Sequence, residues 1–373
     1  MDFSLTEAQQ ELQGLATRIL ADRMTPAHLK ERDRSDDWYD LDTWAEFAKA
    51  NLLGIAIPES AGGLGLGFLD LCLVLREVGR HVAPLPAVPT LVGGALPIAR
   101  FGTEAQQAVL ARVASGETLL TAALVEPGAE PERPVATATR DGDGWRLDGV
   151  KSNVPGMHRA TTVLVPASVD GGVAVFLVPV DTVGISATRQ QTMNHEPLFE
   201  VRLDGVRVGD DALLGSVANG HDVLRFVVDR VTVATCAVVS GVADQAVRLT
   251  AQYTCDRKQF DRAIGTFQAV GQRMADCFID DQAIELTMLQ AATHLDEGLD
   301  VPLEVATAKF WAADGGHRIG HAALHIHGGI SIDLDFPIHR YFLWLKQAEF
   351  TLGAATPQLR RIGRVLAEQP AAT

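Results

Sequence analysis

Residues 253–268 read YTCDRKQFDRAIGTFQ and separate two long segments of helical pattern, expected at 221–257 and 267–296. The segment places the guanidinium of Arg257, a backbone turn and the amide of Gln268 near the start of a helix. Such a set of donors suits a pyrophosphate, because guanidinium groups and helix N-termini both bind anions. From these residues alone, a solvated basic turn explains the segment equally well.

The chain around this segment falls into three blocks of different pattern. Apolar residues at helical spacing fill 5–114 and 219–368, and the block between them contains short β-type runs at 119–124, 135–139, 145–147, 162–165, 173–178 and 201–203. The turn sequence DGDG at 141–144 predicts a hairpin. We therefore expect a mainly α-helical protein with a central β domain, divided into domains at 1–117, 118–218 and 219–373.

The charge of the chain narrows its possible partners. It has 373 residues and a net charge of −15, so its charge is unfavourable for binding nucleic acid or an anionic membrane. The longest uncharged run of its most apolar region, 231–243, is too short to cross a bilayer, and the N-terminal residues lack the pattern of a signal peptide. Its four cysteines form no CxxC pair, which indicates reduced thiols and a cytoplasmic protein.

Three histidines share one face of a helix expected at 303–325. His317, His321 and His325 stand four residues apart, a spacing at which imidazoles can surround a metal ion. Few acidic residues lie near them in the sequence, and the helix ends directly afterwards at a pair of glycines. We expect no metal here, and predict that the histidines line a polar surface or a ligand edge at the helix end.

The segment at 253–268 resembles the acyl-CoA dehydrogenase family, whose pattern there is Y-x-x-x-R-x-x-F-G-x-P-I-x-x-F-Q. Upstream, LGIAIPE at 53–59 followed by GGLG at 62–65 is similar to the same family. Near the C-terminus, HIHGG at 325–329 is similar to its Q-x-x-G-G segment. The order of helical, β and helical blocks agrees, so the resemblance covers essentially the whole chain.

This resemblance implies a fold with an N-terminal helical domain, a small β-barrel or sandwich and a C-terminal four-helix bundle. It also implies an FAD-containing tetramer that oxidises an acyl-CoA to the α,β-enoyl-CoA. A carboxylate removes the α-proton while the β-hydrogen leaves as hydride to the flavin, which passes electrons to an electron-transfer flavoprotein. Each flavin lies across a subunit interface, and the neighbour's residues bind its pyrophosphate and adenosine. By the resemblance, those residues in this chain are Arg257, Gln268, His325, Ile326, His327, Gly328 and Gly329.

The β domain departs from the family at the segments that surround the flavin ring. The family signature is roughly L-T-E-P-x-x-G-S-D, whereas residues 124–131 read LVEPGAEP and lack the hydroxyl residue and the Ser-Asp pair. The family's W-I-T/S-N segment corresponds to SNVPG at 152–156, without the aromatic plate, and Pro155 has no backbone donor. These changes remove most of the contacts that would tune a flavin.

The catalytic carboxylate is also missing from its usual position. The family's Y-E-G-T-x-x-x-x-R corresponds to LGAATPQLR at 352–360, so Gly353 stands where the base is expected. Some members place the base on an earlier helix, just before an arginine, and this chain has Asp229 before Arg230 there. Its side chain is one methylene shorter than glutamate, and an acid paired with a neighbouring arginine is the simpler explanation. Glu349 lies about one helical turn too early to replace the base.

The chain therefore keeps the half-site that a subunit lends to its neighbour and lacks its own ring and base site. This pattern is similar to the β-type subunit of heteromeric α2β2 acyl-CoA dehydrogenases of bacterial steroid catabolism, which act on a cholesterol-type side-chain CoA thioester. We expect it to complete the FAD site of a homologous catalytic subunit, with two flavins per heterotetramer. Two alternatives stay open: a self-sufficient homotetramer with Asp229 as base, and a non-catalytic assembly or acyl-CoA-binding protein.

Overall fold

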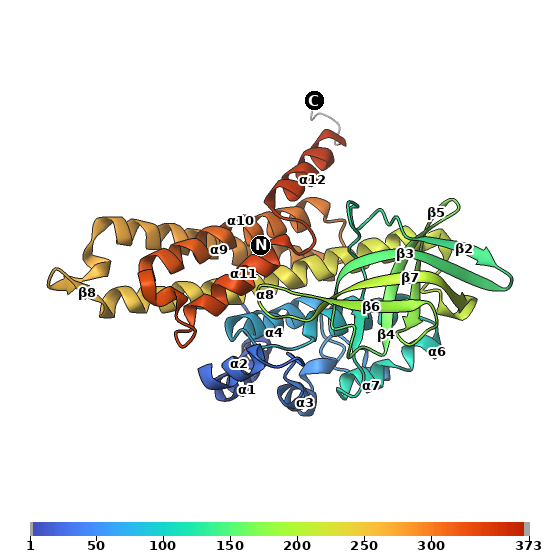
Figure 1. Ribbon diagram of the computed structural model, residues 1–373, viewed down its shortest axis with the longest axis horizontal. Helices are drawn as coiled ribbons and strands as arrows, with labels where there is room; N and C mark the ends of the chain where they lie inside the picture. The colour runs from blue at the N-terminus through green and yellow to red at the C-terminus, as the bar shows by residue number, and fades with distance from the viewer. Residues whose placement is uncertain (1–2, 369–373) are drawn as a thin grey trace. The chain divides into compact units, whose positions relative to one another are not determined.

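The computed structural model describes residues 3–368, which form two compact units (Figure 1). One unit contains the described parts of 1–36, 68–84 and 232–373, and the other contains 37–67 and 85–231. The division falls within the long helix α8, Gly220–Asp256. The predicted division consists of three consecutive domains and places all N-terminal helices in one of them. The two compact units divide these helices between them.

The N-terminal block is helical, as predicted. Thr6 begins the first helix with a reciprocal cap, because its hydroxyl accepts from Gln9 N at 3.3 Å and the Gln9 side chain accepts from Thr6 N at 3.1 Å. The elements are α1 (Glu7–Arg23), α2 (Pro26–Asp33), α3 (Leu41–Lys49), η1 (Leu52–Gly54), η2 (Glu59–Ala61), α4 (Phe68–Arg80), η3 (Val88–Ala95), α5 (Leu96–Phe101), α6 (Glu104–Gln107) and α7 (Leu110–Ala114). The glycine-rich residues 62–67 form the turn between η2 and α4.

Two glycines allow α4 and α8 to pack closely within the first unit. A Cβ on Gly79 would lie 2.0 Å from the carbonyl oxygen of Val238, and one on Gly241 would lie 1.8 Å from that of Arg76. Any larger residue at either position would push the helices apart. The two helices therefore meet backbone to backbone, a contact that only glycine permits.

The predicted β domain is confirmed as one curled seven-stranded sheet. Its order is β1-β4-β2-β3-β7-β6, with β5 paired to β4, and its strands are β1 (Leu120–Ala122), β2 (Thr137–Asp141), β3 (Gly144–Pro155), β4 (Thr162–Val169), β5 (Gly172–Pro179), β6 (Ile185–Gln190) and β7 (Leu198–Gly209). The predicted hairpin joins β2 to β3 by a two-residue turn, since Asp141 pairs with Gly144. Strand β6 was not predicted, because its side chains are mostly exposed and its sequence ISATRQ carries little apolar alternation.

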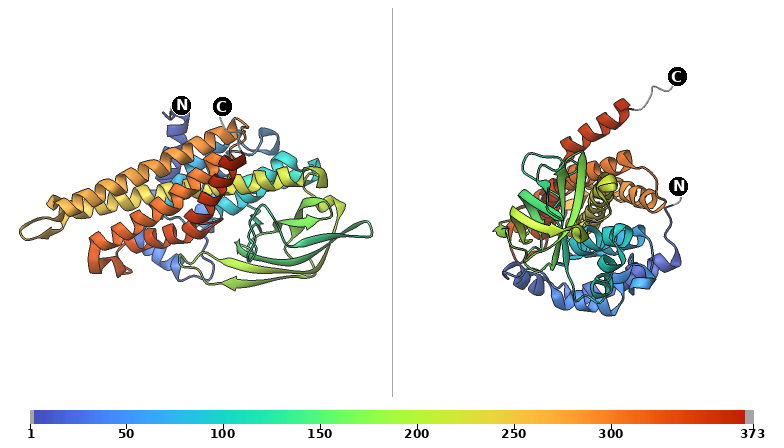
Figure 2. Two further views of the ribbon diagram at one scale, coloured as in Figure 1. Left: turned by 90° about the horizontal axis from the view of Figure 1, so that it is seen from above. Right: turned by 90° about the vertical axis from the view of Figure 1, so that its right-hand side faces the viewer.

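The C-terminal helical domain is also confirmed, and η4 (Asp210–Ala212) and η5 (Val217–Asn219) precede it. Its elements after α8 are β8 (Lys258–Gln259), β9 (Arg262–Ala263), η6 (Ile264–Thr266), α9 (Gln268–Asp296), α10 (Pro302–His327), η7 (Gly328–Ile332), α11 (Ile338–Phe350) and α12 (Ala355–Glu368). Helices α9 and α10 lie side by side along most of their length (Figure 2). The predicted helices at 221–257 and 267–296 match α8 and α9 to within a residue at each end.

One helical stretch within the described residues, Val217–Asp256, is long and apolar enough by composition to cross a membrane. However, 78% of its most apolar part is buried inside the protein. This burial is that of a core helix in a water-soluble fold, so the apolar character of α8 is explained by packing.

Candidate functional site

The segment between α8 and α9 forms a small β-hairpin. Lys258 pairs with Ala263 in the short strands β8 and β9, and Ile264 N donates to Arg257 O at 2.8 Å. The turn residues Phe260 and Asp261 have φ values of 53° and 60°. Aspartate tolerates this left-handed conformation better than most residues, so the hairpin closes although the family glycine is replaced by Asp261. The hairpin lies at one end of α8 and α9 (Figure 1).

The two side chains that the sequence singled out in this segment are both exposed. Arg257 has no acidic partner among the described residues, although the chain as a whole is strongly acidic. Gln268 is the first residue of α9, whose N-terminus is not capped by any side chain of the described chain. An unpaired guanidinium and an uncapped helix N-terminus are both free to bind an anion.

An aromatic stack connects the hairpin to the loop at 325–329. The Tyr253 ring, from the last turns of α8, stacks on the His327 ring at 4.3 Å between centroids, and Phe336 lies 5.2 Å from His327 on another side. Tyr253 Oη also donates to His327 O at 3.4 Å. The structure thus brings two of the three family motifs together, and Tyr253 is the contact that joins them.

His327 itself is buried and is only partly satisfied. Its Nδ1 donates to Ala323 O at 2.8 Å, while its Nε2 has no hydrogen-bond partner among residues 3–368. Burial lowers the pKa of His327, so its imidazole is neutral at neutral pH and Nε2 is an acceptor. His325 is exposed, and a Cβ on Gly328 or Gly329 would meet open space. This end of α10 therefore offers accessible backbone and one unused acceptor.

The segment that would face a flavin ring in the β domain is closed by its own hydrogen bonds. Asn153 N donates to Gln190 Oε1 at 3.0 Å, and Gln190 Nε2 donates to the Ser152 hydroxyl at 3.4 Å. Ser152 N donates to Val125 O at 2.8 Å, and Pro155 has no N–H to give. The amides of Ser152 and Asn153 and the Ser152 hydroxyl are thus used within the chain, and Gln190 is a residue that sequence reasoning missed.

Glu126, the glutamate of the altered signature, is also bonded to other groups of the chain. Glu126 forms a buried ion pair with Lys151 at 2.5 Å and accepts from Val135 N and Ala136 N at 2.7 and 2.9 Å. Lys151 also donates to Pro166 O at 2.6 Å. Burial lowers the pKa of Lys151, and the nearby Glu126 carboxylate opposes that shift. These bonds hold the signature loop to the sheet and leave the pair no polar group for a ligand.

No carboxylate takes the place of the base at the loop after α11. Gly353 has a φ of 97°, and a Cβ there would lie 3.1 Å from Gln358 Nε2. The carboxylate of Glu349 is engaged by Lys346 at 2.6 Å and lies 3.2 Å from His317 Nδ1. Asp229 is 6% exposed on α8. Among residues 3–368, no three His, Cys, Asp or Glu side chains are grouped so as to hold a metal ion.

Comparison with known proteins identifies the family. Residues 6–117 match the model described as "Acyl-CoA dehydrogenase, N-terminal domain", and residues 222–367 match "Acyl-CoA dehydrogenase, C-terminal domain". The chain belongs to the acyl-CoA dehydrogenase family. It is 42% identical to "Acyl-CoA dehydrogenase FadE27" of Mycobacterium tuberculosis over the full length of both chains, and 32% identical to FadE28 of the same organism over 97% of this chain and 98% of that one.

Solved acyl-CoA dehydrogenases have the same fold. A chain of the "ChsE4-ChsE5 complex from Mycobacterium tuberculosis" superposes with a TM-score of 0.94 at 42% identity and full coverage of both chains. A chain of the "Tcur3481-Tcur3483 steroid ACAD G363A variant" gives 0.92 at 43% identity over 97% of this chain and 98% of that one. Butyryl-CoA dehydrogenase from Megasphaera elsdenii gives 0.89 at 25% identity over 99% and 100%.

Acyl-CoA dehydrogenases use FAD, and the residues at 257–268 and 325–329 fit one half of that cofactor. Arg257 and the uncapped start of α9 are suitable donors to a diphosphate, and a cofactor can approach the backbone closely at Gly328 and Gly329, where a Cβ would meet open space. The ring of His327 is buried against Tyr253, so this residue supports the 325–329 segment from within the fold. The segments at 124–131 and 152–156 do not fit the ring half, because Glu126 and the amides of Ser152 and Asn153 are already bonded within the chain.

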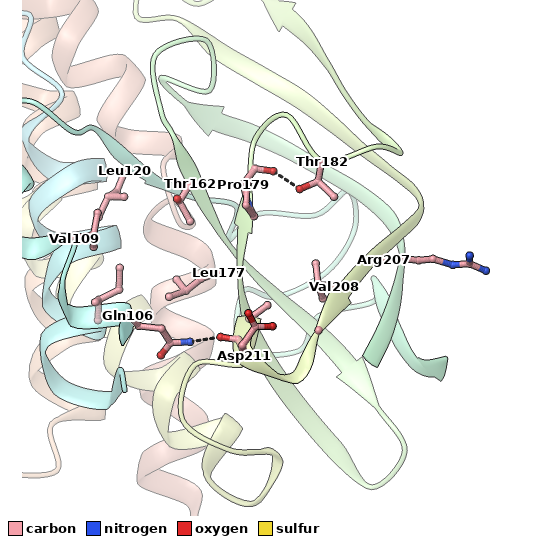
Figure 3. A pocket seen from close by; sticks show the side chains of 13 residues that line it. Gln106, Val109, Leu120, Thr162, Leu177, Pro179, Thr182, Arg207, Val208 and Asp211 are labelled. Carbon is pink, nitrogen blue, oxygen red and sulfur yellow. Dashed lines mark hydrogen bonds between the residues drawn. The ribbon is translucent and has the colours of Figure 1, made fainter. Parts of the chain in front are cut away.

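A hollow of about 410 Å³ also lies in the second unit, beside the sheet (Figure 3). Its lining includes the apolar side chains of Leu120 and Leu177, and two of its polar side chains are bonded to other parts of the chain. Gln106 Nε2 donates to Asp211 O at 2.8 Å, and Arg207 points away from the hollow toward Asp141. None of the candidate residues lines this hollow, so it is separate from the site described above.

Proposed function

We propose that this chain is the flavin-completing subunit of a heteromeric acyl-CoA dehydrogenase that desaturates a steroid side-chain CoA thioester of cholesterol type. The observation that carries the proposal is the contrast between two half-sites. Arg257 and Gln268 are exposed and have no acidic or capping partner among the described residues, whereas Glu126, Lys151 and the amides of Ser152 and Asn153 are bonded within the chain. The relatives support a heteromeric steroid enzyme, since one is titled a complex of two chains and another a steroid enzyme.

In this proposal the chain contributes binding and the partner contributes the base. Arg257 neutralises the FAD pyrophosphate, Gln268 and the start of α9 bind beside it, and residues 325–329 hold the adenosine end. FAD supplies the hydride acceptor for the β-carbon of the acyl-CoA. Gly353 has no side chain at the expected base position and Glu349 is paired with Lys346, which supports proton removal by a carboxylate of the partner.

The proposal sets the composition of the complex. Each heterodimer has one competent ring site, so an α2β2 tetramer holds two flavins. The complex binds the acyl-CoA at the partner's ring and passes electrons to an electron-transfer flavoprotein. The net charge of −15 of this chain and its four free, scattered cysteines suit a cytoplasmic enzyme.

Substitution of Arg257 tests the proposal. In a complex co-expressed with a partner that carries the catalytic glutamate, Arg257→Ala removes a guanidinium from a diphosphate, and charge-assisted bonds of this kind contribute roughly 1.5–3 kcal/mol each. We expect the bound flavin per heterodimer to fall at least about tenfold after dilution, as measured from its visible absorbance. Lys258→Ala is the matched control, because it removes a neighbouring exposed positive charge of the same hairpin. Full flavin occupancy in Arg257→Ala would contradict the proposal and favour a non-catalytic assembly protein.

A further inference from the structure

A line of cationic and imidazole side chains continues from the proposed half-site along the helices of the first unit. We call it the cationic stripe; its members are Arg273 on α9, His317, His321 and His325 on α10, and Lys346 on α11. Eight residues separate His317 from His325, so the stripe extends about 12 Å along α10 from the residues at 325–329. It is unusual on a chain whose net charge is −15.

Contacts between α10 and α11 hold three of these side chains together. The rings of His317 and His321 lie 4.4 Å apart, and Lys346 Nζ lies 3.0 Å from His317 Nδ1. His321 packs edge-on against Phe342 of α11 at 5.1 Å. These side chains are therefore arranged in the folded subunit before any partner binds.

Acidic side chains neutralise the positive charge of the stripe only in part. Among the described residues, the acidic side chain in direct contact with the stripe is Glu349, which pairs with Lys346 at 2.6 Å and neutralises its ammonium group. Arg273 is exposed and has no ion pair among the residues that the structure describes. His321 and His325 are exposed as well. Arg273 and a protonated His321 repel each other, and an acidic surface placed over them would relieve that repulsion.

The position of the stripe indicates which molecule binds to it. If Gln268 and residues 325–329 bind a flavin that is seated in the partner, the partner must cover this end of α9 and α10. The stripe continues on the same two helices, within about 12 Å of that point. It is made only of side chains on helix surfaces, without the backbone donors that a small phosphate ligand usually requires. We infer that the cationic stripe receives an acidic segment of the catalytic partner subunit, so that protons strengthen the assembly and salt weakens it; this inference rests on the proposed function.

The direction of the pH effect follows from the groups that face His321. In the free subunit, burial lowers the pKa of His321, and His317 and Lys346 lower it further, as does Arg273 on α9; only Glu349 opposes the shift. An acidic partner segment would raise this pKa, so the complex would bind more protons than the free subunits. Association is therefore stronger at about pH 6 than at about pH 7.5, by roughly threefold to fivefold for a shift near one pKa unit.

The test uses the co-expressed complex and measures its dissociation on dilution by mass photometry, with increasing salt. We expect Arg273→Glu to raise the dissociation constant at least about tenfold and to lower the salt concentration at which the complex separates. His321→Gln should flatten the pH dependence while leaving the affinity at about pH 7.5 within a factor of about two. Arg112→Glu is the control, because it reverses a similarly exposed charge on α7. Circular dichroism of each variant shows that it is folded.

Three results would each overturn the inference. One is a complex whose Arg273→Glu variant dissociates like the Arg112→Glu control, and another is a wild-type complex that weakens as the pH falls. The third is an effect of the substitutions on self-association of this chain alone, which would assign the stripe to a second copy. Flavin content of the wild-type complex is measured in parallel. If it shows one flavin per heterodimer while the stripe variants behave normally, the inference fails and the proposed function stands.

Discussion

The segments at 253–268 and at 149–156 correspond to the two halves of one cofactor site in the acyl-CoA dehydrogenase family, and in this chain they differ in how their polar groups are used. In the first, Arg257 is exposed without an acidic partner among the described residues and the start of α9 is uncapped. In the second, Ser152 and Asn153 are bonded to Gln190, and Lys151 is bonded to Glu126. The difference suggests how a ring site is lost while the fold survives: its donors become internal hydrogen bonds.

The largest effect is expected from the buried ion pair of the closed half. Lys151→Met leaves the Glu126 carboxylate buried at the signature loop with only the two amide donors at 135 and 136. Removing one partner of a buried ion pair costs roughly 3–5 kcal/mol, so we expect the β domain to lose most of its stability. Thermal unfolding by circular dichroism measures it, with exposed Lys49→Met as the control. A melting temperature equal to that of the control would show that the pair does not hold this loop.

Restoring a glutamate at the vestigial base position should destabilise the chain without creating an enzyme. Gly353→Glu places a side chain at φ 97° and a Cβ 3.1 Å from Gln358 Nε2. We expect a loss of about 1–3 kcal/mol and no dehydrogenase activity in the lone chain. Thr356→Glu, an exposed position on the following helix, is the control. Activity in the lone Gly353→Glu protein would show that the ring half is still competent.

Removal of the Gln190 side chain is expected to lower stability less than the two substitutions above. Gln190→Ala leaves Asn153 N without its acceptor, which costs about 1 kcal/mol. Hydrogen exchange at 152–154 should accelerate, while flavin content of the complex stays at one per heterodimer. A second flavin in this variant would mean that Gln190 alone blocks the ring site, and that the lost aromatic and hydroxyl contacts matter less.

The smallest effect is expected from substitution of Asp229, the candidate base of the self-sufficient homotetramer. If the partner supplies the base, Asp229→Asn changes the turnover of the complex less than about twofold. A general base at this position would instead cost at least about 10²-fold. Steady-state assays with an acyl-CoA distinguish the two results. A large loss with unchanged flavin content and folding would favour the self-sufficient enzyme with Asp229 as base.

The sequence predicts those features whose signals are local. The cap at Thr6, the turn at 141–144 and the ends of α8 and α9 follow from residues within one turn of each other. The exposed and unpaired state of Arg257 and Gln268 also agrees with their predicted role as a half-site for a neighbour. Their contact with a cofactor stays a prediction, as does the division into domains at 1–117, 118–218 and 219–373.

The features that sequence reasoning missed depend on contacts between distant residues. Gln190 meets Asn153 across 37 positions, and nothing in the local sequence of β6 indicates that contact. The left-handed residues Phe260 and Asp261 give the turn of the β8–β9 hairpin a conformation that was expected to need the family glycine. The joining of two motifs by Tyr253 and His327 likewise becomes visible only when the ends of α8 and α10 meet.

The most direct test of the central claim is a flavin-to-protein ratio, taken from visible absorbance of this chain purified alone and of its co-expressed complex. A chain that lends a half-site and lacks a ring site gives no flavin alone and one flavin per heterodimer in the complex. Stoichiometric flavin on the lone chain, or two flavins per heterodimer, would contradict the account.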